Sequence, residues 1–74
     1  MCLGIPMRIV ELNYPCGVCE VDGVFRKVNF QLLPEGELQV GDYVIVHVGF
    51  ALQKVSREEA EESIRLLREL ASHA

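Results

Sequence analysis

The chain has 74 residues and a formal net charge of −4 at pH 7; 50% of its residues are hydrophobic and 24% are charged. This length allows one small domain, and this share of hydrophobic residues is enough for a core, which excludes a disordered chain. The seven basic residues are scattered along an acidic chain. This composition argues against nucleic acid and anionic membrane as partners, because both are bound through clustered Lys and Arg.

The first residues of the chain predict its compartment. Residues 1–11 contain no basic leader followed by a long apolar run, and no apolar stretch of the chain is long enough to cross a bilayer. We therefore expect a cytoplasmic protein, in which thiols are kept reduced. Three cysteines are an odd number and cannot form a complete disulfide framework. Packed, metal-binding and reactive cysteines remain as alternatives.

The pattern of apolar and turn residues divides the single domain, residues 1–74, into a strand-rich part, residues 1–55, and a helix, residues 56–72. Five strands are predicted at residues 5–14, 18–21, 24–30, 43–48 and 51–55, since these runs are rich in Val, Ile and Leu and end at turn residues. Turns are expected at residues 13–17 and 33–36, where Pro and Gly occur. Asp22-Gly23 suits a two-residue hairpin, because both residues tolerate positive φ.

The fourth predicted strand has two different faces. Side chains alternate along a strand, so one face is wholly apolar and is expected in the core: Val44, Val46, Val48 and Phe50. His47 then belongs to the opposite face, outside the main core.

The last predicted element is a helix with a clear start. Ser56 is a good N-cap, and Glu59 three residues later completes a capping box. Apolar residues recur at helical spacing from Ala60 to Ala71. This stripe predicts a lid packed on a small sheet, with a helix that docks a partner as the alternative. Short strands avoid exposed edges by closing on themselves, so we predict a mainly β fold, a small OB-like barrel of about five strands with a C-terminal α-helix.

Cys2 is the first residue that points to chemistry. Removal of Met1 would leave a free amine beside the thiol, and the two groups together can chelate a metal. The neighbouring ammonium would also raise the thiolate fraction. The simpler interpretation is a small apolar residue near a chain end.

His47, Cys16 and Cys19 are the other candidates. Imidazole is a common ligand of iron and other first-row metals, but a histidine can also be hydrogen-bonded on a strand surface. Cys16 and Cys19 form one Cys-x-x-Cys in a predicted turn, which is half of a zinc site that Cys2 and His47 would complete. Packing of the turn and a redox-sensitive pair are the alternatives. The sequence contains no phosphate loop or catalytic triad signature, so no enzyme activity is expected.

Two segments resemble the signatures of the HypC/HupF family of nickel–iron hydrogenase maturation chaperones. Residues 1–6 read MCLGIP and residues 41–51 read GDYVIVHVGFA, and residues 23–28 between them also fit. The similarity covers essentially the whole chain. It departs from the family at Met7, where Gly is frequent, and at Cys16 and Cys19, which lie outside the signatures.

The resemblance implies an OB-like barrel with a C-terminal helix and no tightly bound cofactor. It implies two partners, the iron–sulfur scaffold HypD and the precursor of the hydrogenase large subunit, to which a transient Fe(CN)2CO unit is delivered. The essential cysteine of the family maps to Cys2, and its signature histidine, a proposed iron ligand or contact, maps to His47. The rest of the N-terminal motif is Leu3, Gly4, Ile5 and Pro6. A small zinc-stabilised or oligonucleotide-binding barrel is the competing interpretation.

Overall fold

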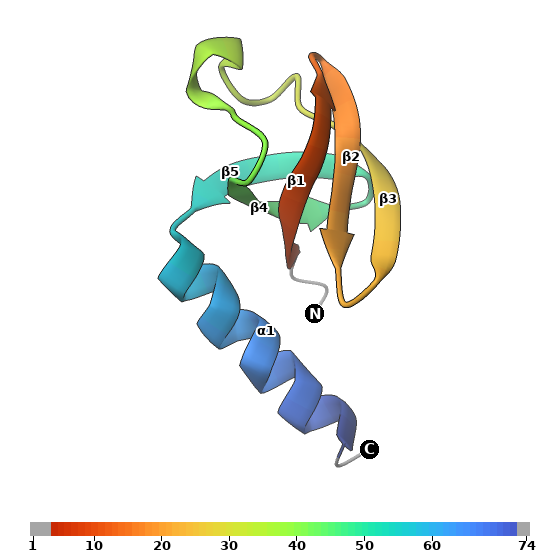
Figure 1. Ribbon diagram of the computed structural model, residues 1–74, viewed down its shortest axis with the longest axis vertical. Helices are drawn as coiled ribbons and strands as arrows, with labels where there is room; N and C mark the ends of the chain where they lie inside the picture. Colours follow the sequence, from red (N-terminus) through yellow and green to blue (C-terminus); the bar gives the residue numbers. More distant parts are fainter. Residues whose placement is uncertain (1–3, 73–74) are drawn as a thin grey trace.

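The computed structural model describes residues 4–72, which form a small barrel with a helix beneath it (Figure 1). In chain order the elements are β1 (Ile5–Asn13), β2 (Cys16–Val21), β3 (Val24–Asn29), the short 3-10 helix η1 (Glu35–Glu37), β4 (Tyr43–His47), β5 (Phe50–Val55) and α1 (Arg57–Ser72). The strands close in the order β1-β2-β3-β5-β4, and β4 returns to pair with β1. The prediction of a mainly β fold, with a five-stranded barrel and a C-terminal helix, is confirmed.

Apolar side chains from all five strands fill the barrel. The buried core consists of Met7, Ile9, Cys19, Val28, Phe30, Leu38, Val44 and Ala51. Met7, which departs from the family pattern, is thus part of the core. Within residues 4–72, every buried side-chain nitrogen or oxygen has a hydrogen-bond partner, as stable interiors require.

The turn between β1 and β2 is shorter than predicted. It consists of Tyr14 and Pro15, which are joined by a cis peptide bond. The Tyr14 hydroxyl donates a hydrogen bond to the Leu33 carbonyl at 2.8 Å and so ties the loop after β3 to this turn. Since β2 already begins at Cys16, the expectation that Cys16 and Cys19 lie in a turn is wrong; both are strand residues.

The hairpin between β4 and β5 also differs from the prediction. Val48 (φ 52°) and Gly49 (φ 82°) form a two-residue turn, and His47 pairs with Phe50 across it. The expectation that Val48 and Phe50 belong to the core is therefore wrong, because the chain reverses before them. Val48 is 81% exposed and Phe50 is 37% exposed, whereas Val44 is fully buried.

Helix α1 begins at the predicted capping box. The Glu59 N–H donates to Ser56 Oγ at 3.0 Å, and the Ser56 N–H donates to the Glu59 carboxylate at 3.3 Å. Ala60 is buried, and α1 contacts β1 and β4. Further along, three leucines of the predicted stripe remain 43–69% exposed: Leu66, Leu67 and Leu70. The later turns of the helix thus leave much of the apolar stripe open to solvent.

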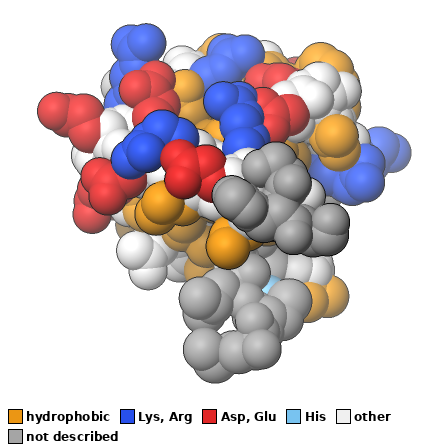
Figure 2. Space-filling view, turned by 90° about the horizontal axis from the view of Figure 1, so that it is seen from below, with side chains coloured by type: hydrophobic (Ala, Val, Ile, Leu, Met, Phe, Trp, Pro, Cys, Tyr) orange, Lys and Arg blue, Asp and Glu red, His pale blue; other side chains and the backbone are white. Residues whose placement is uncertain are grey.

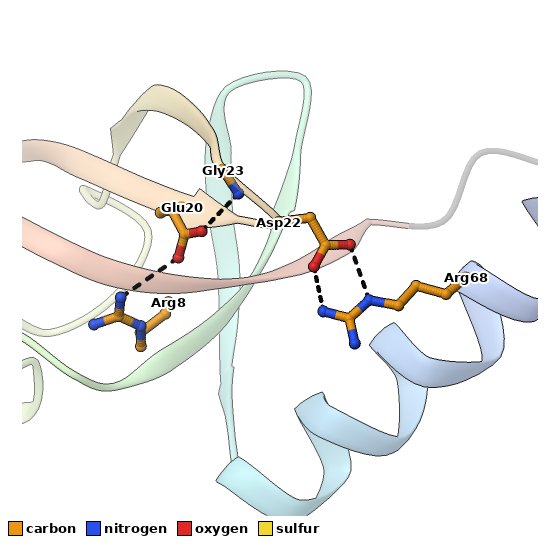
Figure 3. Close-up of polar contacts among 5 residues, drawn as sticks. All are labelled: Arg8, Glu20, Asp22, Gly23 and Arg68. Atoms are coloured by element: carbon orange, nitrogen blue, oxygen red, sulfur yellow. Dashed lines mark hydrogen bonds and ion pairs between the residues drawn. The ribbon is translucent and has the colours of Figure 1, made fainter.

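An ion pair holds the far part of α1 to the barrel. Arg68 Nε donates to Asp22 Oδ2 at 3.0 Å, and a second guanidinium nitrogen contacts the other carboxylate oxygen (Figure 3). Asp22 lies in the β2–β3 turn. In the same turn the Gly23 N–H donates a hydrogen bond to the Glu20 carboxylate at 2.8 Å. The helix is therefore fixed at two points, its packed start and this pair.

The underside of the molecule carries both signs of charge. Figure 2 shows basic and acidic side chains interspersed there, with hydrophobic side chains beside them. Among the described side chains of this face, the basic ones form no continuous stripe of the kind that follows a phosphate backbone. None of the helical segments within residues 4–72 has the length and apolar character needed to span a membrane.

Candidate functional site

The pairing of β1 with β4 brings the start of the described chain to the end of β4. The register pairs Ile5 with Val46 and Pro6 with Ile45 in antiparallel order. The next position on β1's side is Gly4, and the next on β4 is His47. The N-terminal motif and the signature histidine, which are far apart in sequence, therefore meet at one end of the barrel.

Gly4 contacts β4 very closely. A Cβ placed on Gly4 would lie 2.2 Å from Ile45 Cγ2 and 3.0 Å from the Val46 carbonyl oxygen. Only glycine permits such an approach of one backbone to another strand. The glycine of the motif is thus explained by packing against β4.

His47 is the last residue of β4 and is half-buried. Residues directly opposite in an antiparallel pair share a face of the sheet, so His47 shares its face with Phe50. Alternation along β4 puts Ile45 on the same face. His47 therefore shares its face with two apolar residues and does not belong to the buried core, as predicted.

Two predicted site residues, Cys2 and Leu3, lie outside the described residues. The structure shows where they attach to the fold, because Gly4 follows Leu3 directly and packs against Ile45 and Val46. Ile5 and Pro6 are the first residues of β1; Ile5 is half exposed and Pro6 is buried.

Cys16 and Cys19 are not brought together. Three residues along a strand span about 10 Å and put the two side chains on opposite faces; Cys16 is exposed and Cys19 is fully buried. Burial raises the pKa of the Cys19 thiol to about 11. The Cys19 thiol is therefore protonated at neutral pH, whereas a metal ligand must be a thiolate.

The zinc set proposed from the sequence has no support in the geometry. Within residues 4–72, no group of three or more His, Cys, Asp or Glu side chains is placed to hold a metal ion. Three of the four proposed ligands lie in this range, namely Cys16, Cys19 and His47. Cys19 packs in the core instead of binding a metal.

Val48 is exposed beside His47, although the sequence pattern had predicted that it belongs to the core. The signal for it was the Val48-Gly49 dipeptide between two apolar runs, where Gly suits a tight hairpin. The β-branched side chain favoured a continuous strand instead, and so the turn was placed too late in the chain.

Comparison with known proteins identifies the family of this chain. The sequence model of the HupF/HypC family matches residues 1–67. A Cupriavidus necator protein named Hydrogenase maturation factor HypC is 48% identical over 71 residues, which are 95% of this chain and 77% of that protein. Proteins of the same name from Azotobacter chroococcum and Rhizobium leguminosarum bv. viciae are 48% and 45% identical; the matches cover 100% and 96% of this chain, and 87% and 93% of those proteins. The chain therefore belongs to the HupF/HypC family.

Proposed function

We propose that this protein is a maturation factor of nickel–iron hydrogenase that helps deliver the Fe(CN)2CO unit to the precursor of the large subunit. Its family consists of maturation chaperones and not of catalysts, so the protein is not an enzyme. One observation carries the proposal. Gly4 packs against Ile45 and Val46, and this contact places the beginning of β1 beside the end of β4 that carries His47.

The chain between Cys2 and Gly4 is short enough to keep the two candidate ligands together. An extended chain advances at most about 3.6 Å per residue, so two residues allow about 7 Å. A thiol attached at position 2 therefore stays within reach of the end of β4. The Cys2 thiolate and the His47 imidazole are thus able to contact one iron.

The iron unit is cargo in this scheme. Low-spin iron that carries cyanide and carbon monoxide accepts a thiolate and an imidazole as further ligands. Two protein ligands hold the iron unit through few bonds, so the iron unit can leave the site. We infer that Cys2 is the transfer ligand and that His47 is a second ligand or an orienting group.

The remaining ligands must then come from a partner. We propose the iron–sulfur scaffold HypD as the donor of the iron unit and the large-subunit precursor as its acceptor, both in the cytoplasm. The name of the three relatives, Hydrogenase maturation factor HypC, supports the maturation role. The finer assignment to these two partners rests on the family resemblance of Cys2 and His47.

The decisive variant is Cys2→Ala, with Cys16→Ala as its matched control, because Cys16 is an exposed cysteine in β2. We expect Cys2→Ala to abolish the complex with HypD and hydrogenase maturation in the host, while the melting temperature stays unchanged. Cys16→Ala should form the complex and support maturation. Normal maturation with Cys2→Ala would contradict the proposal.

An infrared spectrum separates a carrier of iron from a docking adaptor. Cyanide and carbon monoxide on iron absorb where proteins do not. The protein purified without oxygen from its own host should show these bands, and Cys2→Ala should lack them. If intact protein that co-purifies with HypD shows no bands, the iron chemistry belongs to the partner alone.

A further inference from the structure

Two hairpins of the barrel use the same turn with different residues. Asp22 and Gly23 have φ values of 51° and 81°, and Val48 and Gly49 have φ values of 52° and 82°. Both turns have the two positive φ angles of type I′, for which Asn, Asp and Gly are the preferred residues. The β2–β3 turn follows this preference at its first position, and the β4–β5 turn does not.

The backbone conformation of Val48 is strained, and contacts within the chain do not offset this strain. A β-branched residue at positive φ is a genuine outlier, because its side chain clashes with the backbone. Its side chain is also 81% exposed, so packing within the chain does not offset this strain. Strained residues of this kind persist where the strain belongs to a functional site.

The turn is held rigidly beside His47. The Asn29 N–H donates to the Gly49 carbonyl at 2.8 Å, and Asn29 pairs with Phe50 across the β3–β5 junction. Phe50 itself is 37% exposed and lies opposite His47. Val48 is therefore a preorganised apolar knob, with a second apolar side chain nearby and a candidate iron ligand as its direct neighbour.

We propose that Val48 is the apolar anchor of the transfer complex and inserts into an apolar pocket of the iron-bearing scaffold next to the iron. This inference rests on the proposed function and adds the surface by which the scaffold is recognised. We identify the scaffold as the partner because Val48 directly follows His47, the residue that would contact the iron carried by the scaffold. Interfaces gain most from a few rigid, buried anchors at their centre, and Val48 meets both requirements once it is covered.

The test uses three variants of the full chain. Val48→Asn replaces the strained residue by one that accepts the turn, Val48→Thr keeps the β-branched shape but adds a hydroxyl, and Val40→Asn is the control. Val40 is also an exposed valine, 60% exposed, and lies before β4, at the end of the strand away from Val48. For each protein we would measure the melting temperature, the mass in solution and the affinity for purified HypD.

We expect Val48→Asn to raise the melting temperature by about 4–8 °C, the shift that relief of a modest strain gives in a domain of this size. The same variant should bind HypD at least tenfold more weakly. Val48→Thr should weaken binding without the gain in melting temperature, and Val40→Asn should change neither quantity.

The possible contrary results are distinct. Wild-type affinity of Val48→Asn for HypD would overturn the anchor and leave the proposed function intact. A wild-type protein that does not bind HypD at all would overturn both. An unchanged or lower melting temperature of Val48→Asn would remove the strain argument and with it the anchor. A wild-type dimer that Val48→Asn dissociates would assign the knob to a second copy of the chain and overturn the scaffold as its occupant.

Discussion

At the scale of single residues, the close packing at the start of β1 requires a glycine at position 4. Gly4 contacts β4 so closely that a methyl group would overlap Ile45 Cγ2. In the sequence, Gly4 follows Cys2 and Leu3, so it connects the candidate transfer ligand to β1. A change at Gly4 therefore acts on the stability of the barrel and on the position of the transfer ligand.

We predict that Gly4→Ala lowers the free energy of unfolding by about 1–3 kcal/mol, the usual penalty of overpacking. Gly36→Ala is the control, because a Cβ on Gly36 would meet nothing within 4 Å. Urea denaturation of the two variants measures the difference. Equal stability of both would show that the contact between Gly4 and β4 contributes nothing to folding.

At the scale of elements, helix α1 has two unlike halves. The first turns are capped by Ser56 and Glu59 and packed through Ala60. The later turns expose leucines and are joined to the barrel by the pair of Arg68 and Asp22. The Arg68 guanidinium lowers the pKa of the Asp22 carboxyl below its ordinary value of 3.8. Both side chains are exposed, so this pair positions the helix more than it stabilises the fold.

We predict that Arg68→Ala speeds amide hydrogen exchange in the last turns of α1 and leaves the first turns unchanged. Arg65→Ala is the control, since Arg65 pairs with Glu69 on the same helix, at 3.2 Å, and not with the barrel.

In the wild type, acid should speed amide exchange in the last turns of α1, as Arg68→Ala does at neutral pH. A lowered carboxyl pKa means that the pair stabilises the docked helix above the ordinary value of 3.8 and loses this effect as the pH falls through the lower folded value. Exchange in Arg68→Ala should not respond to acid in this way. A wild-type helix whose exchange resembles that of Arg68→Ala at neutral pH would contradict the role of the pair.

At the scale of the whole molecule, one thiol in the core makes stability depend on alkaline pH. Cys19 is fully buried, and burial raises the pKa of its thiol from 9.0 to about 11. The unfolded chain therefore loses this proton at a lower pH than the folded chain does. Since the folded pKa is raised, the stabilising effect is complete below about pH 9 and disappears as the pH rises towards about 11.

We predict that the wild type loses roughly 2–3 kcal/mol more stability than Cys19→Ala does between these pH values, since each pKa unit is worth about 1.4 kcal/mol. Cys16→Ala should lose as much as the wild type, because it keeps the buried Cys19 thiol. Denaturant titrations at a series of pH values compare the three proteins. Parallel curves for wild type and Cys19→Ala would show that the thiol ionises alike in both states.

The barrel and the helix follow from local signals that agree with one another. Asp22-Gly23 predicted its hairpin, and Ser56 with Glu59 predicted the start of α1, because turn and cap chemistry act within a few residues. The Val48 turn was missed, since the register of β4 with β1 and β5 overrides the strand preference of a β-branched residue.

The candidate site was predictable in its parts but not in its assembly. The sequence alone named Cys2 and His47, whose roles stay predictions. The contact of Gly4 with Ile45 and Val46 was not predictable, because it exists only after β4 has paired with β1. The separation of Cys16 from Cys19 likewise depends on β2 starting early, directly after the Tyr14–Pro15 turn.

The closure of the barrel is uneven, and this has a consequence for its motions. Within residues 4–72, β3 and β5 are joined by the single parallel pair of Asn29 and Phe50, supported by the hydrogen bond from Asn29 to Gly49. Low local contact density marks the places where native proteins open first. The barrel is therefore expected to open first at this junction when it partly unfolds, with the β4–β5 hairpin still paired to β1 and the β1–β3 meander still folded. The turn beside His47 would then lose its attachment to β3 before the rest of the barrel unfolds.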